Sequence, residues 1–207
     1  MVDKILTPKF RGSYVSVIIP RRPKSGKGEA KYQCTIVLPQ DDPKVMRWMP
    51  KLEANLNDAM VEKFGKIHPQ KLHKHWPIRD GNDYIDEDGI PKEEFAGNWV
   101  IGAKNSRPPG LSILHEDGTR EEVEDRALVA ETFYSGAFYY ASINSFAWQN
   151  EEGGKGVSIS LSGLLWAGEG ERFGGGSFSA SEFDGINETA PPPKRKAAPA
   201  PATEDDI

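Results

Sequence analysis

Two late stretches of the sequence decide the fold: GAFYYASINSFAW at residues 136–148 and GVSISLSGLLW at residues 156–166. In the second stretch, apolar residues alternate with serines, which is typical of a strand with one buried face. The intervening NEEGG at 150–154 consists of turn-forming residues. The pattern predicts a long β-hairpin.

Earlier segments predict further strands and one helical element. KFRGSYVSVII (9–19) and AKYQCTIVL (30–38) indicate two strands, and shorter strands are expected at 98–104, 111–115 and 127–130. A helix signal spans 42–64, where Asp41 or Asp42 can cap and Pro43 suits the first helical position. Pro50 interrupts its pattern, which leaves either one kinked helix or two short ones.

The order of these elements does not fit a parallel α/β fold. Strands followed by a helix, more strands and a closing hairpin favour a mainly β protein, a small antiparallel barrel with one helical insertion. The expected domain covers residues 1–175, with a helical insertion at 42–64 and an irregular one at 65–95.

The C-terminal residues have a different composition. APPPKRKAAPAPATEDDI (190–207) has no apolar periodicity, so burial cannot offset the entropy of ordering it. We expect residues 176–207 to be a flexible linker and acidic tail, disordered and ending in Glu204, Asp205, Asp206 and Ile207. The tail is either a terminus without a role or an arm that recruits partners.

Cysteine usage and hydropathy limit the classes of protein. Cys34 is the single cysteine, which excludes an internal disulfide and a zinc site built from several cysteines. Its place among alternating apolar residues predicts a buried structural thiol. There is no apolar run of membrane-spanning length and no signal-peptide core, so we expect a cytoplasmic protein with no membrane contact.

The net charge of −5 hides a strong asymmetry along the chain. Residues 1–80 hold sixteen Lys and Arg against eight Asp and Glu, whereas residues 81–189 hold seven against twenty. The loop PRRPKSGKG (20–28) contains four cations and no anion. Such asymmetry predicts contact with a polyanion on a restricted face.

Catalytic and metal-site motifs are weak. GKG at 26–28 lacks the spacing of a phosphate-binding loop, and DYIDEDG at 83–89 does not place carboxylates where a calcium loop requires them. His68, His73 and His75 have no carboxylate or thiol at a recognisable metal-binding spacing. We therefore expect no metal, no cofactor and no enzymatic activity.

Single-strand binding needs cations for phosphates and rings on which bases stack, and the sequence offers both. Residues 133–148 contain seven aromatics. In strand register, Phe138, Tyr140, Phe146 and Trp148 share one face, and small or aliphatic residues with Tyr139 share the other. Either the first face is an exposed stacking platform, or its large rings form the core.

Several short motifs, in one shared order, resemble bacteriophage single-stranded DNA-binding proteins. They are PKFR (8–11), KY (31–32), PIRDG (77–81), GNWV (97–100), YSG (134–136), NSFAW (144–148), KGVS (155–158) and GERFGG (170–175). The resemblance implies an OB fold and sequence-nonspecific binding of single-stranded DNA in phage replication, recombination or repair. It also implies that the acidic tail, residues 204–207, contacts replication or recombination proteins. Such tails often end in phenylalanine, where this chain has Ile207.

The leading hypothesis is therefore a non-enzymatic single-stranded DNA-binding protein, with homo-oligomerisation possible. The expected phosphate contacts are Arg11, Arg21, Arg22, Lys24, Lys27 and Lys31, with Lys104 and Arg107 as further additions. The expected stacking rings are Tyr14, Trp99, Tyr140, Phe146 and Trp148. Two rivals are a protein-interaction module without DNA affinity and a metal-dependent nuclease built on Asp80, Asp83, Asp86 and Asp88 with the histidines.

Overall fold

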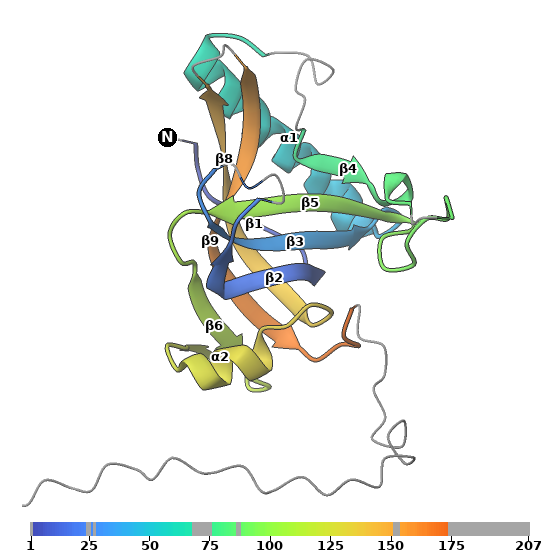
Figure 1. Cartoon of the computed structure of the whole chain (residues 1–207), viewed down its shortest axis with the longest axis vertical. Coiled ribbons are helices and arrows are strands. Elements are labelled where there is room, and N and C mark those ends of the chain that lie inside the picture. The colour runs from blue at the N-terminus through green and yellow to red at the C-terminus, as the bar shows by residue number, and fades with distance from the viewer. Residues whose placement is uncertain are drawn as a thin grey trace, which may run out of the picture. The chain divides into compact units, whose positions relative to one another are not determined.

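Nine strands and two α-helices form the described part of the chain, which comprises residues 2–23, 26, 28–67, 76–85, 88–150 and 154–173 of a computed structural model (Figure 1). The strands are β1 (Ile5–Leu6), β2 (Phe10–Arg21), β3 (Lys31–Pro39), β4 (Ile78–Asp80), β5 (Asn98–Asn105), β6 (Gly110–Leu114), β7 (Arg120–Glu122), β8 (Phe138–Gln149) and β9 (Lys155–Gly168). The helices are α1 (Pro43–Phe64) and α2 (Arg126–Thr132), with a 3₁₀ turn, η2, at Gly81–Asp83.

Five of these strands close a ring. β2 pairs with β3, β3 with β5, β5 with β9, β9 with β8, and β8 pairs back with β2. All of these pairings are antiparallel except β5 with β9, which run parallel where Ala103 meets Ile159. A five-stranded, partly open ring of this kind is OB-like. The expectation of a mainly β, OB-like fold is confirmed, with a parallel contact that the expected antiparallel barrel did not contain.

The ring of strands encloses the core, and burial along β8 shows which face of this strand points into it. Ala137, Tyr139, Ala141 and Ile143 are at most 1% exposed, and the Tyr139 hydroxyl donates to the carbonyl of Tyr134 at 2.8 Å. The alternate residues of β8 are partly exposed at Phe138 and Tyr140 and exposed at Phe146. The aliphatic face with Tyr139 is therefore the core, and the face with the other rings points outward.

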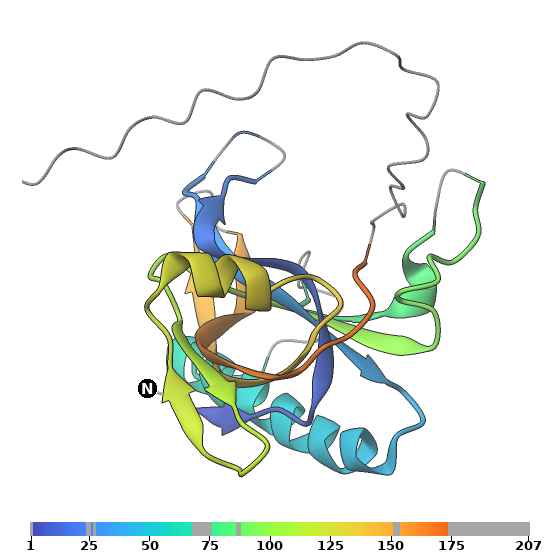
Figure 2. The same ribbon diagram turned by 90° about the horizontal axis from the view of Figure 1, so that it is seen from below.

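The first helix covers the outside of the ring, as Figure 2 shows from below. The Asp42 side chain accepts a hydrogen bond from the amide of Lys44, and Gly65 ends α1 in the left-handed conformation. Its buried stripe, which includes Trp48, Leu52 and Leu56, packs into the core. Residues 43–64 are thus a single helix that continues through Pro50.

Several short elements differ from the sequence expectation. Residues 127–130, expected as a strand, lie in α2, which begins because the Asp125 side chain accepts from the amides of Ala127 and Leu128. Strands β1, β4 and β7 were not expected. The insertion at 65–95, expected to be irregular, contains β4 and η2.

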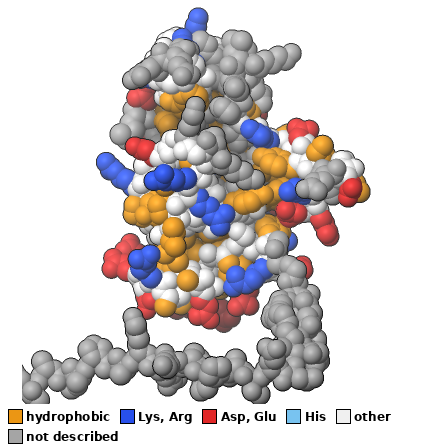
Figure 3. Space-filling view, viewed as in Figure 1, with side chains coloured by type: hydrophobic (Ala, Val, Ile, Leu, Met, Phe, Trp, Pro, Cys, Tyr) orange, Lys and Arg blue, Asp and Glu red, His pale blue; other side chains and the backbone are white. Residues whose placement is uncertain are grey.

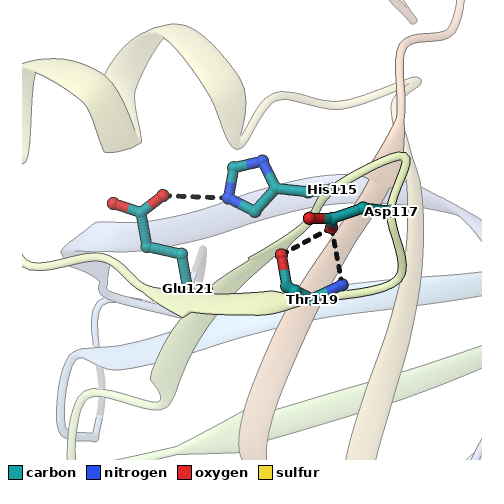
Figure 4. A network of polar contacts seen from close by, with 4 residues as sticks. All are labelled: His115, Asp117, Thr119 and Glu121. Atoms are coloured by element: carbon teal, nitrogen blue, oxygen red, sulfur yellow. Dashed lines mark hydrogen bonds and ion pairs between the residues drawn. The ribbon is translucent and has the colours of Figure 1, made fainter.

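The turn between β6 and β7 is held by side chains (Figure 4). The Asp117 carboxylate accepts from the amide of Thr119 at 2.9 Å and from its hydroxyl at 2.6 Å. These two hydrogen bonds lower the pKa of Asp117. His115 and Glu121 meet across the same hairpin at 2.9 Å.

Other expectations concern single positions or undescribed segments. Cys34 is fully buried, and this burial raises the pKa of its thiol, as expected of a structural cysteine. Several selected residues lie outside the described ones: Lys24, Lys27, the three histidines at 68, 73 and 75, Asp86, and residues 174–207, which include the whole expected tail. No helix among the described residues is long and apolar enough to cross a membrane.

Candidate nucleic-acid interface

A groove of about 400 Å³ lies on the outer face of β3 and β5, between β4 and the β8–β9 hairpin. We call it the central groove. Its cations and rings are Lys31, Arg79, Lys104, Trp76, Tyr84 and Phe146, and Thr35, Pro77, Val100, Gly102, Ser158 and Ile159 complete its lining.

The strand register explains why its floor is open. Thr35 pairs with Gly102, so a small side chain faces a residue with none. Lys104 lies two pairs further along, opposite Gln33. Because the residues between them, Cys34 and Ala103, are buried, the groove residues share the opposite, outward face. Alternation along two strands thus places Lys104 beside a shallow channel.

The β8–β9 hairpin supplies the ring of Phe146, which is 40% exposed. Phe146 pairs with Ser158, whose hydroxyl accepts a hydrogen bond from the indole of Trp148 at 2.9 Å. The Trp148 ring lies over Gly156, where a Cβ would overlap it. Trp148 is thereby fixed against β9, and Phe146 is the ring of this hairpin that enters the groove.

The opposite wall comes from residues that the sequence analysis did not select: Trp76, Arg79 and Tyr84. Arg79 is exposed on β4, which pairs with β5 opposite Val100, and Ile78 beside it is buried. The sequence signal for this wall was the alternation of Trp76, Ile78 and Asp80 with Pro77 and Arg79. The strand itself, β4, has three residues, and so short a run is not enough to predict a strand.

A buried ring anchors the loop that borders the groove. Phe95 is fully buried on the outer face of the sheet against Val37 and Val100. Tyr84 packs on it with ring centroids 4.9 Å apart, and Tyr14 stacks on it at 6.3 Å. Tyr14, expected to stack with bases, is 45% exposed and adopts a φ of 48°.

The cations of the central groove are not neutralised. Among the described residues, Lys31, Arg79 and Lys104 form no ion pair with a carboxylate. Arg21 is the register partner of Lys31, so a further exposed cation adjoins the groove. Unpaired cations at such a site attract polyanions, because no internal contact has to be broken first.

Four other selected residues lie elsewhere. Arg22 is exposed beyond the end of β2, and Arg107 is exposed just after β5. Arg11 donates to the carbonyl oxygens of Gly136 at 3.2 Å and Glu171 at 2.6 Å. Trp99 packs against the main core, on the face of β5 opposite to that of Lys104, so the structure does not bring it into the central groove.

Positive and negative side chains occupy different parts of the surface around the central groove. Figure 3 shows Lys and Arg side chains interspersed with hydrophobic ones across the middle of the face that carries β2, β3 and β5. Asp and Glu gather at the lower edge of this face and on the loop that projects to the right. On this face, carboxylates thus lie mainly at the edges, and cations and hydrophobic side chains occupy the middle.

Possible metal ligands do not cluster in the described residues. These residues contain no group of three or more His, Cys, Asp or Glu side chains that could hold a metal ion. Asp80, a member of the rival nuclease site, accepts hydrogen bonds from the Gln40 side chain at 3.0 Å and from the Asn82 amide at 2.9 Å. Its role in this structure is to cap η2.

An OB-like ring that carries cations on β3 and β5 and an accessible aromatic ring on β8 defines the class of OB-fold oligonucleotide-binding proteins. The model of one family, described as "Enterobacter phage Enc34, ssDNA-binding protein", matches residues 3–191. The chain belongs to this family.

Individual relatives agree with this assignment. Protein p50 of Acyrthosiphon pisum secondary endosymbiont phage 1 is 28% identical over 166 residues, which cover 79% of this chain and 83% of that protein. The single-stranded DNA-binding protein of bacteriophage Enc34, solved in complex with ssDNA, superposes with a TM-score of 0.65 at 25% identity, covering 83% of this chain and 89% of that one. The gp2.5 protein of bacteriophage T7 shares the fold, with a TM-score of 0.50 at 15% identity, covering 92% of this chain and 98% of that one.

Proposed function

We propose that this protein binds single-stranded DNA in the central groove without reading its sequence. The observation that carries the proposal is the meeting of three unpaired cations, Lys31, Arg79 and Lys104, with the exposed ring of Phe146 in one open channel. Phosphates lie along the cations, and unstacked bases lie on Phe146 and on the rings of the opposite wall. Family membership supports the same function.

Binding of this kind does not depend on the DNA sequence, because it uses base stacking and phosphate contacts. Every base has a face that can stack on a ring, and every nucleotide carries the same phosphate. A lysine ammonium is a point charge that does not distinguish one phosphate from the next. Binding of this kind needs no enzymatic step, metal or cofactor.

The biological role that fits this binding is in phage DNA replication, recombination or repair in the cytoplasm of the host cell. The acidic residues 204–207 would recruit replication or recombination proteins. Removing residues 190–207 tests this role. Partner capture should be lost, while DNA binding should tighten because an internal anion that competes for the groove is removed.

The direct test of DNA binding uses intrinsic tryptophan fluorescence and gel mobility. Oligo-dT and a mixed-sequence strand should both quench the fluorescence at low salt and lose this effect at high salt, whereas a duplex should bind more weakly. Absence of quenching and of a mobility shift with both strands would refute the proposal. Strand cleavage with magnesium or manganese would favour the nuclease instead.

A further inference from the structure

A second groove, of about 890 Å³, lies between the N-terminal half of α1 and the outer side of β2 and β8. We call it the side groove. The cations that line it are Lys9, Arg11, Lys44, Arg47 and Lys51. The carboxylates that line it are Asp42, Glu93 and Glu94, so cations are in excess.

Three of these cations form a row on the helix. Lys44, Arg47 and Lys51 are spaced i, i+3 and i+7, so they lie on one side of α1 over a length of about 10 Å. All three are exposed, and none forms an ion pair with a described carboxylate. The nearby Asp42 is engaged as the cap of the helix. The row is therefore free to meet an external anion.

The wall opposite the helix is aromatic. Phe138 and Tyr140 are partly exposed on the outward face of β8 and line the same groove. Lys9 lies over the Phe138 ring, with its ammonium 5.0 Å from the centroid. Cations facing partly exposed rings are the combination that holds a single strand, whereas an acidic peptide would need the cations alone.

The side groove adjoins the central groove. Arg11, Val37, Val100 and Arg79 are successive register partners across β2, β3, β5 and β4. The first two line the side groove, and the last two line the central groove. Since adjacent strands lie about 4.8 Å apart, the row spans about 14 Å. Tyr14 and Phe95 stack over this boundary.

We propose that the side groove is a second DNA site, which holds the continuation of the strand bound in the central groove. Phosphates lie along Lys44, Arg47 and Lys51, and a base stacks on Tyr140. This inference rests on the proposed function. A strand long enough to pass Tyr14 occupies both grooves, whereas a short one occupies the central groove alone.

The test compares two double variants of the full chain. R47Q/K51Q removes two side-groove cations, and K63Q/K66Q removes two exposed lysines at the C-terminal end of α1 and just beyond it. Each is titrated with oligo-dT of about 6 and about 20 nucleotides, lengths chosen around the known site sizes of OB folds. Thermal unfolding confirms that both variants fold.

For R47Q/K51Q, binding of the short strand should stay within about twofold of wild type, and binding of the long strand should fall about tenfold. Its salt slope for the long strand should decrease by about 1.4 log units per decade, which corresponds to two lost phosphate contacts. K63Q/K66Q should change neither the affinity for the long strand nor its salt slope.

Unchanged binding of the long strand, or equal losses for both lengths, would overturn the inference and leave the proposed function standing. Failure of the wild-type protein to bind either strand would refute the proposed function itself. A labelled oligoglutamate peptide that binds wild type but not R47Q/K51Q, with DNA binding unchanged, would assign the groove to an acidic protein partner and also overturn the inference.

Discussion

Phe146 and Lys104 line one groove, although β6, β7 and α2 separate their strands along the chain. The ring comes from β8 and the ammonium group from β5, and β9 pairs with both strands. The closed ring of strands therefore brings a stacking surface and a phosphate contact together. Each can be tested separately.

Lys104→Gln removes a phosphate contact and should weaken oligo-dT binding at low salt. The salt slope should fall by about 0.7 log units per decade, because one fewer counterion-releasing contact is made. Titrations over a salt series measure both quantities. Lys63→Gln, an equal change of charge on an exposed helical residue, is the control, and an equal effect of both variants would contradict the role of Lys104.

Phe146→Leu removes the ring and keeps an apolar side chain. It should cost about 1–3 kcal/mol of binding free energy, since that is the value of one stacked base. Because Phe146 is 40% exposed, the free energy of unfolding should change little. Phe146→Trp should retain binding. If the leucine variant binds as wild type does, the stacking role of Phe146 is wrong.

Gly81→Ala should destabilise the loop that carries Phe95. A Cβ at residue 81 would overlap the backbone carbonyl of Phe95, so the backbone must move. We expect a loss of about 3 kcal/mol of unfolding free energy, measured by chemical denaturation. The matched control is Gly102→Ala, where nothing lies within 4 Å of the added atom. Equal stability of the two variants would contradict this packing.

Thr119→Val removes the hydroxyl that donates to Asp117 and should raise the pKa of that carboxyl toward its ordinary value. Because the folded pKa is lowered, the contribution of Asp117 to stability is present above the unfolded pKa. It is lost as the pH falls through the folded pKa. NMR titration of the Asp117 carboxyl carbon measures the shift, and an unchanged pKa in the variant would show that the hydroxyl does not cause it.

Much of the fold could be predicted because its long elements carry strong local patterns. The serine alternation of β9 and the cap and proline at the start of α1 are examples. The strand predicted at residues 127–130 was wrong because a short apolar run fits either a strand or a helix. The helix cap at Asp125 decides in favour of the helix. The parallel contact of β5 with β9 leaves no local signal at all.

The candidate site was predicted less completely than the fold. Lys31, Lys104 and Phe146 were selected and do meet in the central groove. Trp76 and Arg79 were missed because their position depends on β4 pairing with the distant β5. Alternation alone could not show that Trp99 faces the core, since both faces of β5 are partly apolar.

The most direct test of the central claim is lysine acetylation footprinting of the full chain, with and without saturating oligo-dT, read out by mass spectrometry. Lys31 and Lys104 should be protected by DNA, while Lys63 should be labelled equally in both states. Equal labelling of Lys31 and Lys104 with and without bound DNA would contradict the claim that the central groove holds the strand.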